Sequence, residues 1–383
     1  MAASRRTKNS RATDELALAR GALLAGIALV SACTSTQRAR EPPINPDVAR
    51  AEIAKLLPAK IANRDGWAID IFAAFDALSI TPTTQNVCAV IAVTEQESTF
   101  QVNPPVQGLP AIARREIDAR AARYHVPAFA VNAALELQSP TGATYRERLS
   151  KVKTEKGLSD IFADFIDMVP LGAHLFGSLN PVRTGGPMQV SIDFAEEHAD
   201  AKRYPYPSHG PIRDEVFTRR GGMYFGIAHL LDYPAAYDDM LFRFADFNAG
   251  HYASRNAAFQ NVVSILSKTP LALDGDLLLH GRAASEPSKT ELAIRKIADR
   301  IELSDGAIRR DLELSKEEEF VETRLYERVF VLADKGKAMS RAVIPNIRLE
   351  SPKITRKLTT EWFARRVHER YGKCLSRAPQ RPT

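Results

Sequence analysis

One carboxylate in this chain is a candidate for acid–base chemistry. Glu97, followed by Ser98, closes an apolar segment over residues 87–93 that has the composition of a buried helix. A carboxylate at the end of such a helix costs desolvation energy unless something pairs with it or uses it. Burial raises the pKa of a glutamate toward the range of a general acid. Taken alone, a solvated glutamate at a helix end is the more ordinary interpretation.

The neighbouring acid, Glu95, does not complete a pair of catalytic carboxylates. It lies two residues before Glu97, and helix positions two apart do not face each other. A site built on two carboxylates is therefore not expected at this helix end.

Two glycine-containing segments follow Glu97 along the chain. Residues 185–189, Gly-Gly-Pro-Met-Gln, join a loop to an expected helix start, and residues 247–250, Phe-Asn-Ala-Gly, end another helix. Each alone is weak evidence, because glycine marks turns and methionine is usually a core residue. Their order after Glu97 is what makes them informative.

In this order the three segments resemble the lysozyme-like lytic transglycosylases. That family has a Glu-Ser pair after an apolar helix, then Gly-Leu-Met-Gln, then Tyr-Asn-Ala-Gly. The counterparts here are Glu97-Ser98, residues 186–189 and residues 247–250, so the resemblance covers roughly residues 85–260. It implies peptidoglycan glycan strands as the partner and a lysozyme-like helical domain as the fold.

The resemblance also implies a mechanism with one catalytic residue. Glu97 would protonate the glycosidic oxygen between N-acetylmuramic acid and N-acetylglucosamine, then take the proton of the muramic 6-hydroxyl as an anhydro ring closes. This differs from glycosidases that use two carboxylates. No cofactor is implied. The substrate-binding residues that the resemblance implies are Ser98, Gly186, Met188, Gln189, Phe247 and Asn248.

Three features depart from the transglycosylase pattern. Pro187 stands where the family has leucine, and Phe247 replaces a tyrosine whose hydroxyl could orient the catalytic carboxyl. The link from Glu97 to Gly186 is also much longer than in the family. Residues 101–183 are therefore predicted to be an insertion with helices of its own, which would roof the cleft, select the substrate or block it.

The mature chain also resembles the YaiW-like family of uncharacterised bacterial outer-membrane lipoproteins. The segments that carry this resemblance are residues 95–98, 179–191, 243–250 and 349–356. It implies an outer-membrane location through a lipid anchor. A role in the envelope passage of antimicrobial peptides has been proposed for that family, which suggests an inner-membrane peptide transporter as a partner.

The N-terminus has the features of a lipoprotein signal peptide. Basic residues precede an apolar run over residues 21–30, which is shorter than the roughly 20 residues of a membrane-spanning helix. Val-Ser-Ala then leads directly to Cys33, and small residues before a cysteine resemble a lipobox. The alternative is an ordinary signal peptide with a chance cysteine. Thr34, in place of an aspartate, favours the outer membrane over the inner one.

Composition excludes a nucleic-acid-binding protein. The net charge of the chain is +6, and the leader, residues 1–32, carries five Lys/Arg and two Asp/Glu, so the mature protein is left at about +3. These charges are interspersed rather than clustered, unlike a nucleic-acid-binding surface. A hydrophobic content of 45% with 26% charged residues is ordinary for a globular protein.

Other chemistry has weaker support. The eight histidines are scattered without a His-Glu-x-x-His pattern, so no metal site is predicted. Phosphate-binding glycine loops and nucleophile elbows are absent from the sequence. Four arginine pairs, which begin at residues 114, 219, 309 and 365, are interpreted as solvated helix faces.

Two cysteines remain once Cys33 carries the lipid. Cys88 and Cys374 lie in a compartment that permits disulfides. They either pair or stay as two separate buried thiols, and we predict that they pair.

Helical patterns dominate the mature chain, so the predicted fold class is mainly α. Apolar residues recur at helical spacing, and long alternating strand patterns are missing. The predicted helices cover residues 47–57, 64–78, 84–98, 114–124, 128–137, 158–168, 188–199, 214–231, 237–247, 252–267, 289–301, 305–314, 318–335 and 359–373.

The predicted organisation has four parts. Residues 1–32 are a signal peptide and residues 33–45 a proline-containing tether. Residues 46–270 form the lysozyme-like domain that contains the insertion, and residues 271–383 form a C-terminal helical extension. Two functions follow: a lipid-anchored lytic transglycosylase, or a binding protein that holds glycan or cationic peptide in the same cleft without turnover.

Overall fold

The structure is a computed structural model that describes residues 45–168, 179–208, 210–237, 239–281, 284–349 and 356–379. The chain divides into two units, Met1–Pro43 and Ile44–Thr383, and the description below concerns the second. The predicted signal peptide, lipobox cysteine Cys33 and most of the tether lie outside the described residues.

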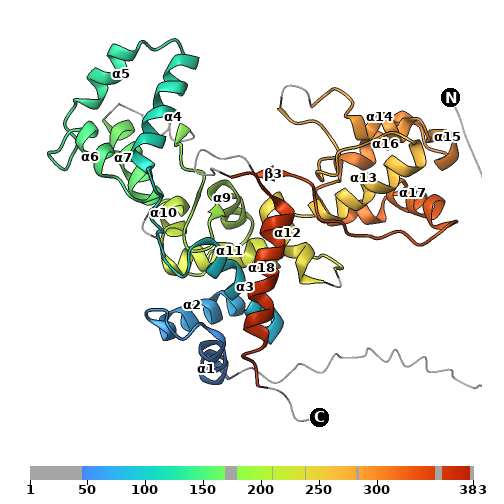
Figure 1. The fold of residues 1–383 in the computed structure, drawn as a ribbon, viewed down its shortest axis with the longest axis horizontal. Coiled ribbons are helices and arrows are strands. Elements are labelled where there is room, and N and C mark those ends of the chain that lie inside the picture. Colours follow the sequence, from blue (N-terminus) through green and yellow to red (C-terminus); the bar gives the residue numbers. More distant parts are fainter. Residues whose placement is uncertain are drawn as a thin grey trace, which may run out of the picture. The chain divides into compact units, whose positions relative to one another are not determined.

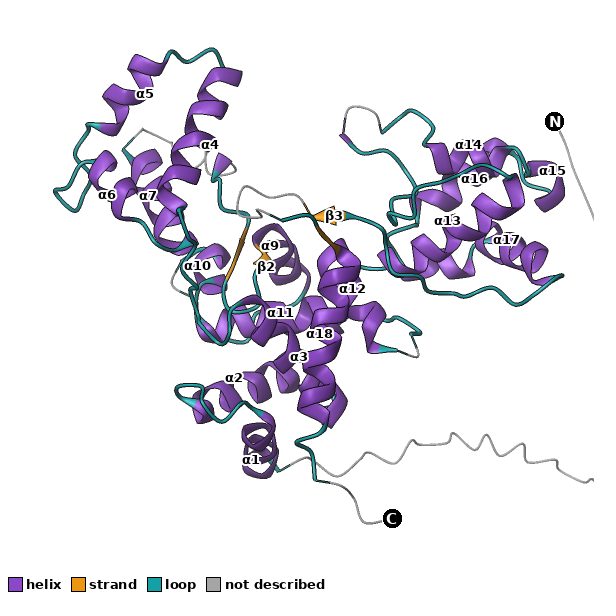
Figure 2. Cartoon of the chain, viewed as in Figure 1, coloured by secondary structure: helices purple, strands orange, loops and turns teal. Residues whose placement is uncertain are grey.

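The described chain is mainly helical, as predicted, and its strands are two residues long (Figures 1 and 2). The helices are α1 (Pro46–Leu56), α2 (Arg64–Ala77), α3 (Thr84–Glu97), α4 (Leu109–Arg123), α5 (Ala128–Leu135), α6 (Tyr145–Lys151), α7 (Glu155–Asp167), α9 (Ile192–Ala201), α10 (Ile212–Val216), α11 (Arg219–Leu231), α12 (Met240–Ala249), α13 (Ala253–Ser267), α14 (Lys289–Arg295), α15 (Ala298–Ile301), α16 (Asp305–Glu313), the 3₁₀ helix η3 (Glu318–Glu322), α17 (Arg324–Asp334) and α18 (Thr360–Leu375).

Two short antiparallel hairpins complete the described secondary structure. The first pairs β1 (Thr184–Gly185) with β2 (Val190–Ser191), and the second pairs β3 (Arg348–Leu349) with β4 (Leu358–Thr359). None of the described helices is both long and apolar enough to cross a membrane.

Side chains bury into two separate hydrophobic cores. The first core is contributed by α1 to α12 and by α18, and it contains the fully buried α3 segment. The second core contains Phe259, Ile294, Leu312 and Phe320, from α13, α14, α16 and η3. In Figure 1, helices α13 to α17 form one group.

The boundary predicted at residue 270 therefore does not coincide with the division between the cores. Helix α13, which precedes that boundary, turns the aromatic face of Phe259 into the second core. Helix α18, which follows it, returns to the first core and packs against both α3 and α12. The division between the two cores depends on apolar contacts between segments far apart in the sequence. The local sequence pattern does not reveal these contacts.

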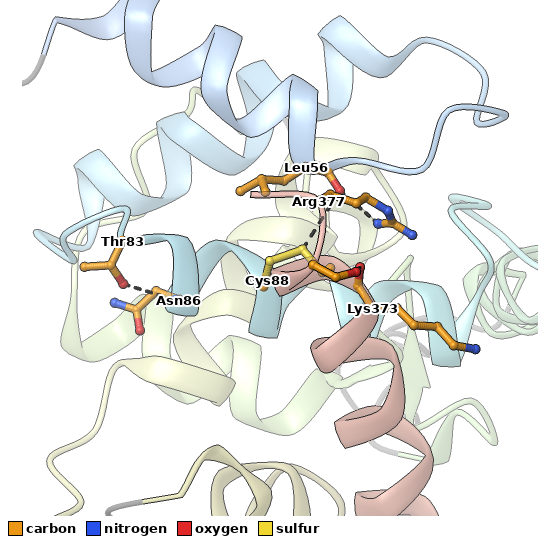
Figure 3. The surroundings of a disulfide bond; sticks show 8 residues. Leu56, Thr83, Asn86, Cys88, Lys373 and Arg377 are labelled. Carbon is orange, nitrogen blue, oxygen red and sulfur yellow. Dashed lines mark hydrogen bonds between the residues drawn. A yellow bond between two sulfur atoms is a disulfide. The ribbon is translucent and has the colours of Figure 1, made fainter. Parts of the chain in front are cut away.

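The predicted disulfide between Cys88 and Cys374 is present (Figure 3). Both cysteines are fully buried, with Cα atoms 5.4 Å apart, and the bond joins α3 to the last turn of α18. Arg377, just beyond α18, donates from Nη1 to the carbonyl oxygen of Leu56 at 2.9 Å. The C-terminus of the described chain is thereby held against α1 and α3.

Within residues 101–183, the parts that the structure describes, 101–168 and 179–183, contain helices α4 to α7. One of them, α6, was not among the predicted helices. It is only seven residues long and is stabilised by a capping box, in which Thr144 and Glu147 bond each other's backbone N–H groups.

Candidate functional site

The structure places Glu97 at the last residue of α3. Residues 87–94 of this helix are all buried, so the apolar sequence anchors it in the first core. The Thr83 side chain accepts a hydrogen bond from Asn86 N at 3.1 Å and fixes the start of the helix. The side chain of Glu97 is half-buried, as are Glu95 and Gln96.

The chain turns sharply directly after Glu97. Thr99 and Phe100 have left-handed φ values of 53° and 60°, and Phe100 packs edge-to-face on Trp67 with ring centroids 5.3 Å apart. Ser98 is buried, and its hydroxyl donates to the carbonyl oxygen of Thr94 at 3.1 Å. This hydrogen bond stabilises the last turn of α3 and thereby helps to fix the position of Glu97.

The Gly-Pro-Met-Gln segment forms the four-residue loop of the β1–β2 hairpin. Gly186 has φ 73°, and a Cβ atom there would lie 2.2 Å from the carbonyl oxygen of Val216. A side chain at Gly185 would similarly lie 2.3 Å from the ring of Phe217. Only glycine permits this close approach of the hairpin to the chain around α10 and α11.

Met188 and Gln189, the two residues expected to line a sugar cleft, differ in position. Met188 is fully buried and fills the space beside Gly226, so its side chain supports the loop from within the core. Gln189 is half-exposed, and its Nε2 donates to the carbonyl oxygen of Gly186 at 3.1 Å. Gln189 is the residue of the loop whose side chain is accessible.

The predicted helix over residues 188–199 begins only at Ile192. Gln189 has a left-handed φ of 51°, which ends the loop, and residues 190–191 pair as a strand with β1. The Ser191 side chain then caps α9 by accepting from Phe194 N at 3.3 Å.

Helix α11 joins the first two segments of the candidate site. Thr94, one turn before Ser98, lies with its hydroxyl oxygen 3.9 Å from the sulfur of Met223 on α11. Pro187 of the hairpin packs closely against the adjacent Gly222. A Cβ atom on Gly222 would lie 2.4 Å from the proline ring. The end of α3 and the hairpin loop therefore pack on neighbouring residues of the same helix.

The third segment ends α12 and is held by α18. Asn248 accepts a hydrogen bond at Oδ1 from the Thr360 hydroxyl at 2.9 Å, at the first residue of α18. Phe247 is mostly buried and stacks on Phe363 with centroids 6.5 Å apart. Since α18 also packs on α3, it connects the helix of Asn248 with the helix of Glu97.

A buried carboxylate adjoins this segment. Asp246 is fully buried and accepts from the hydroxyls of Tyr233 and Tyr237, at 3.2 and 2.7 Å, and from Ser254 N at 2.7 Å. Burial raises the pKa of Asp246, while these hydrogen bonds oppose that shift. The residue fixes the turn between α12 and α13.

A group of histidines lies beside Phe247. His229 donates from Nε2 to the carbonyl oxygen of Phe247 at 3.2 Å, and burial lowers the pKa of His229 to about 3. His251 stacks on His229 and on Tyr233, with centroids 4.6 and 4.1 Å apart, and burial also lowers the pKa of His251. Both rings are therefore neutral at physiological pH. Among the described residues no group of three His, Cys, Asp or Glu could hold a metal ion.

The interpretation of Arg219 and Arg220 as a solvated helix face is wrong. Arg219 pairs with the buried carboxylate of Asp70, and Arg220 pairs with the buried Glu215 at 2.9 Å. Glu215 also accepts from the hydroxyl of Tyr204 at 2.8 Å. These pairs fix the start of α11, the helix on which the hairpin rests. Asp70 lies 149 residues from Arg219 in the sequence, and Glu215 lies five residues before Arg220, outside the i,i+4 spacing of one helix, so local pattern does not reveal either partner.

Comparison with known proteins identifies the family. A family model described as "Protein of unknown function (DUF1615)" matches residues 60–377. The chain belongs to this family. It is also 55% identical to the "Uncharacterized protein YaiW" of Escherichia coli (strain K12) over 331 residues, which cover 86% of this chain and 90% of that protein. No solved structure matches the chain. The resemblance to YaiW-like proteins inferred from the sequence is thus confirmed.

Proposed function

We propose that this chain is a lipid-anchored protein of the outer membrane that binds peptidoglycan glycan strands and cleaves them as a lytic transglycosylase. Cys33 would carry the lipid, and the mature protein would extend from it on the tether of residues 33–45. The bond cleaved is the β-1,4 linkage between N-acetylmuramic acid and N-acetylglucosamine.

The observation that carries this proposal is the common support of Glu97 and the Gln189 loop on α11. Thr94, one turn from the end of α3, contacts Met223, and the loop contacts the adjacent Gly222. Glu97 is half-buried at the end of an apolar helix, and a carboxyl group held in a fixed position is the kind of group that general acid–base catalysis uses.

One carboxyl group is sufficient for the proposed reaction. The proton of Glu97 passes to the glycosidic oxygen as the bond from C1 of the muramic sugar to that oxygen breaks. The resulting carboxylate then accepts the proton of the 6-hydroxyl while the oxygen bonds to C1. The products are a 1,6-anhydromuramic end and a free N-acetylglucosamine hydroxyl, and Glu97 is again protonated. Gln189 and Asn248 are assigned to the walls of the sugar site.

A second candidate function is binding without turnover, with an inner-membrane peptide transporter as partner and glycan or cationic peptide as ligand. The packing of Phe247 favours it. This ring is mostly buried between Phe363 and His229 and offers no hydroxyl to orient a catalytic carboxyl. In this function Glu97 contributes charge and a hydrogen-bond acceptor to the ligand.

The experiment compares wild type with Glu97→Gln and, as the matched control, Glu95→Gln. Purified sacculi are incubated with each protein, and released anhydromuropeptides are measured by mass spectrometry. A positioned acid–base group typically contributes about 10²–10⁴-fold to rate, so Glu97→Gln should lower release by at least about a hundredfold. Glu95→Gln should release amounts close to wild type, and all three proteins should melt at similar temperatures.

The outcomes separate the two functions. No anhydromuropeptide from wild type, with saturable binding to sacculi that Glu97→Gln weakens, would support binding alone. Loss of release in Glu95→Gln with retention in Glu97→Gln would show that the alignment of the first segment is displaced by two residues, and the assignment of Glu97 would then be wrong.

A further inference from the structure

A large apolar cavity lies between helices α4 to α7. The proposed cleavage of glycan strands does not involve this cavity. Its volume is about 1020 Å³, and its walls come from α4 to α7 and residues 179–184. Ligand pockets in proteins usually enclose about 300–1,000 Å³, so this space is at the upper end of that range. Typical walls are Leu109, Val131, Leu135, Leu158, Ile161 and Phe165.

The cavity is open to solvent on one side, where its lining residues Tyr124, Val126 and Leu179 are 71%, 42% and 42% exposed. Its walls are mostly hydrocarbon, and contiguous exposed apolar surface commonly marks a binding site. Ordered water is not stabilised there, because it needs several polar partners. The surroundings therefore favour an occupant that is itself a hydrocarbon.

Two buried polar atoms in these walls point to the other part of the occupant. The side chain of Tyr145 is 1% exposed, and its hydroxyl has no hydrogen-bond partner among the described residues. The buried Nε of Arg120 is also without a partner there, although its Nη1 donates to the carbonyl oxygen of Leu179 at 2.8 Å. Both residues line the cavity, and each offers a donor. Buried donors are normally paired, so an acceptor from outside the chain fits here.

The charged residues that line the cavity favour a negative acceptor. Three are arginines, Arg120, Arg123 and Arg183, and two are acids, Glu116 and Glu155. Arg123 is solvent-exposed, whereas Arg183 pairs with Asp193 at 3.6 Å and Glu155 is buried, so Arg123 is the cation at the accessible edge of the cavity.

We propose that this cavity binds a single acyl chain whose head group is anionic, either the carboxylate of a fatty acid or the phosphate of a lysophospholipid. The chain lies against the aliphatic walls between α4 and α7. The head group accepts hydrogen bonds from Tyr145 and Arg120, and its charge is balanced by Arg120 and by Arg123 at the edge. This site is separate from Glu97, although its wall reaches Thr184 of the β1–β2 hairpin.

The test measures binding of cis-parinaric acid, a fluorescent fatty acid, to the folded full chain carrying Cys33→Ser, so that no acyl chain on that cysteine competes. The site is then probed by displacement with palmitate, lysophosphatidylglycerol, hexadecanol and hexadecylamine. Palmitate and lysophosphatidylglycerol distinguish the two anionic sources. Hexadecanol and hexadecylamine keep a comparable chain but remove or reverse the charge.

A pair of neighbouring alanines on α5 supplies the matched variants. Ala134 lines the cavity, whereas Ala133 is exposed and does not. Ala134→Trp should fill part of the cavity and weaken binding by at least about tenfold, while Ala133→Trp should bind like wild type. Tyr145→Phe should weaken the binding of palmitate by roughly tenfold, because a hydrogen bond to a charged group is lost. The affinity for hexadecanol should stay nearly unchanged.

Binding by wild type that Ala134→Trp weakens and Ala133→Trp preserves, with anions preferred, would support the proposal. No saturable binding by folded protein would overturn it, as would equal binding to both tryptophan variants with unchanged melting temperatures. Preference for hexadecylamine over palmitate would overturn the assignment of an anionic head group.

Discussion

Removing the Cys88–Cys374 disulfide should destabilise the protein strongly, because the bond closes most of the described chain into one loop. The two cysteines are separated by 286 residues. The chain-entropy relation gives about 5–6 kcal/mol for a loop of this length, although measured losses are usually about 2–5 kcal/mol. The variant Cys88→Ala with Cys374→Ala is therefore expected to lose about 4 kcal/mol of unfolding free energy, a large share of the about 5–15 kcal/mol of a typical domain.

The position of the bond suggests where the loss acts first. Both cysteines are fully buried where α18 packs on α3, and the Arg377 hydrogen bond to Leu56 lies beside them. Without the bond, the last turn of α18 is held only by packing and by such hydrogen bonds. Fraying there should precede unfolding of the second core, so the two tryptophans, Trp67 and Trp362, should report an earlier transition than helix content.

The assay is urea unfolding followed by tryptophan fluorescence and circular dichroism, with reduced wild type as the control that contains the native side chains. Thiols are counted separately on the unfolded protein that has not been reduced. Wild type should show no titratable thiol at Cys88 or Cys374, and reduced wild type should match the double variant. Two free thiols per chain, or a double variant as stable as oxidised wild type, would refute this reasoning.

Three other outcomes are expected. Cys33→Ala should abolish labelling with radioactive palmitate and release the protein or leave it as precursor; unlabelled wild type with unchanged membrane association in the variant would contradict the anchor. Burial lowers the pKa of His229 to about 3, so its stabilising contribution is present above about pH 6.5 and is lost as pH falls toward 3. His229→Gln should flatten the dependence of melting temperature on pH in that window. Arg309 pairs with the fully buried Glu291, which keeps Arg295 as a second partner, whereas Arg310 is exposed, so Arg309→Met should cost about 1.5 kcal/mol and Arg310→Met under about 0.5 kcal/mol in urea unfolding.

The parts of the fold that the sequence predicted are those that depend on local pattern. Helix α3 follows from the unbroken apolar run at residues 87–93, and its end at Glu97 was predicted within one residue. The disulfide was predicted by a different route, from the two cysteines left once a lipid was expected on Cys33 and from an expected oxidising compartment. The family resemblance followed from four short segments, each recognisable by its own residues, that occur in the same order as in the family.

The rest depended on contacts that local pattern does not contain. Apolar spacing extended a helix back to Met188, but the spacing arises because Met188 packs into the core from a hairpin loop. The loop exists because Gly186 and Gln189 adopt left-handed φ values, which a periodicity search does not weigh. The partners of Arg219 and Arg220, Asp70 and Glu215, became visible only in three dimensions.

The candidate site depends on both ends of the chain, and this limits how the protein can be divided. Thr360 holds Asn248, Phe363 stacks on Phe247, and Cys374 bonds to the helix that ends in Glu97. Helix α18 supplies all three contacts, although the second core separates it from α12 in the sequence. A fragment ending at residue 270 would retain every segment that resembles a lytic transglycosylase and lose the helix that holds two of them in place. Because α18 supplies these contacts and follows residue 270, either proposed function requires the chain beyond residue 270.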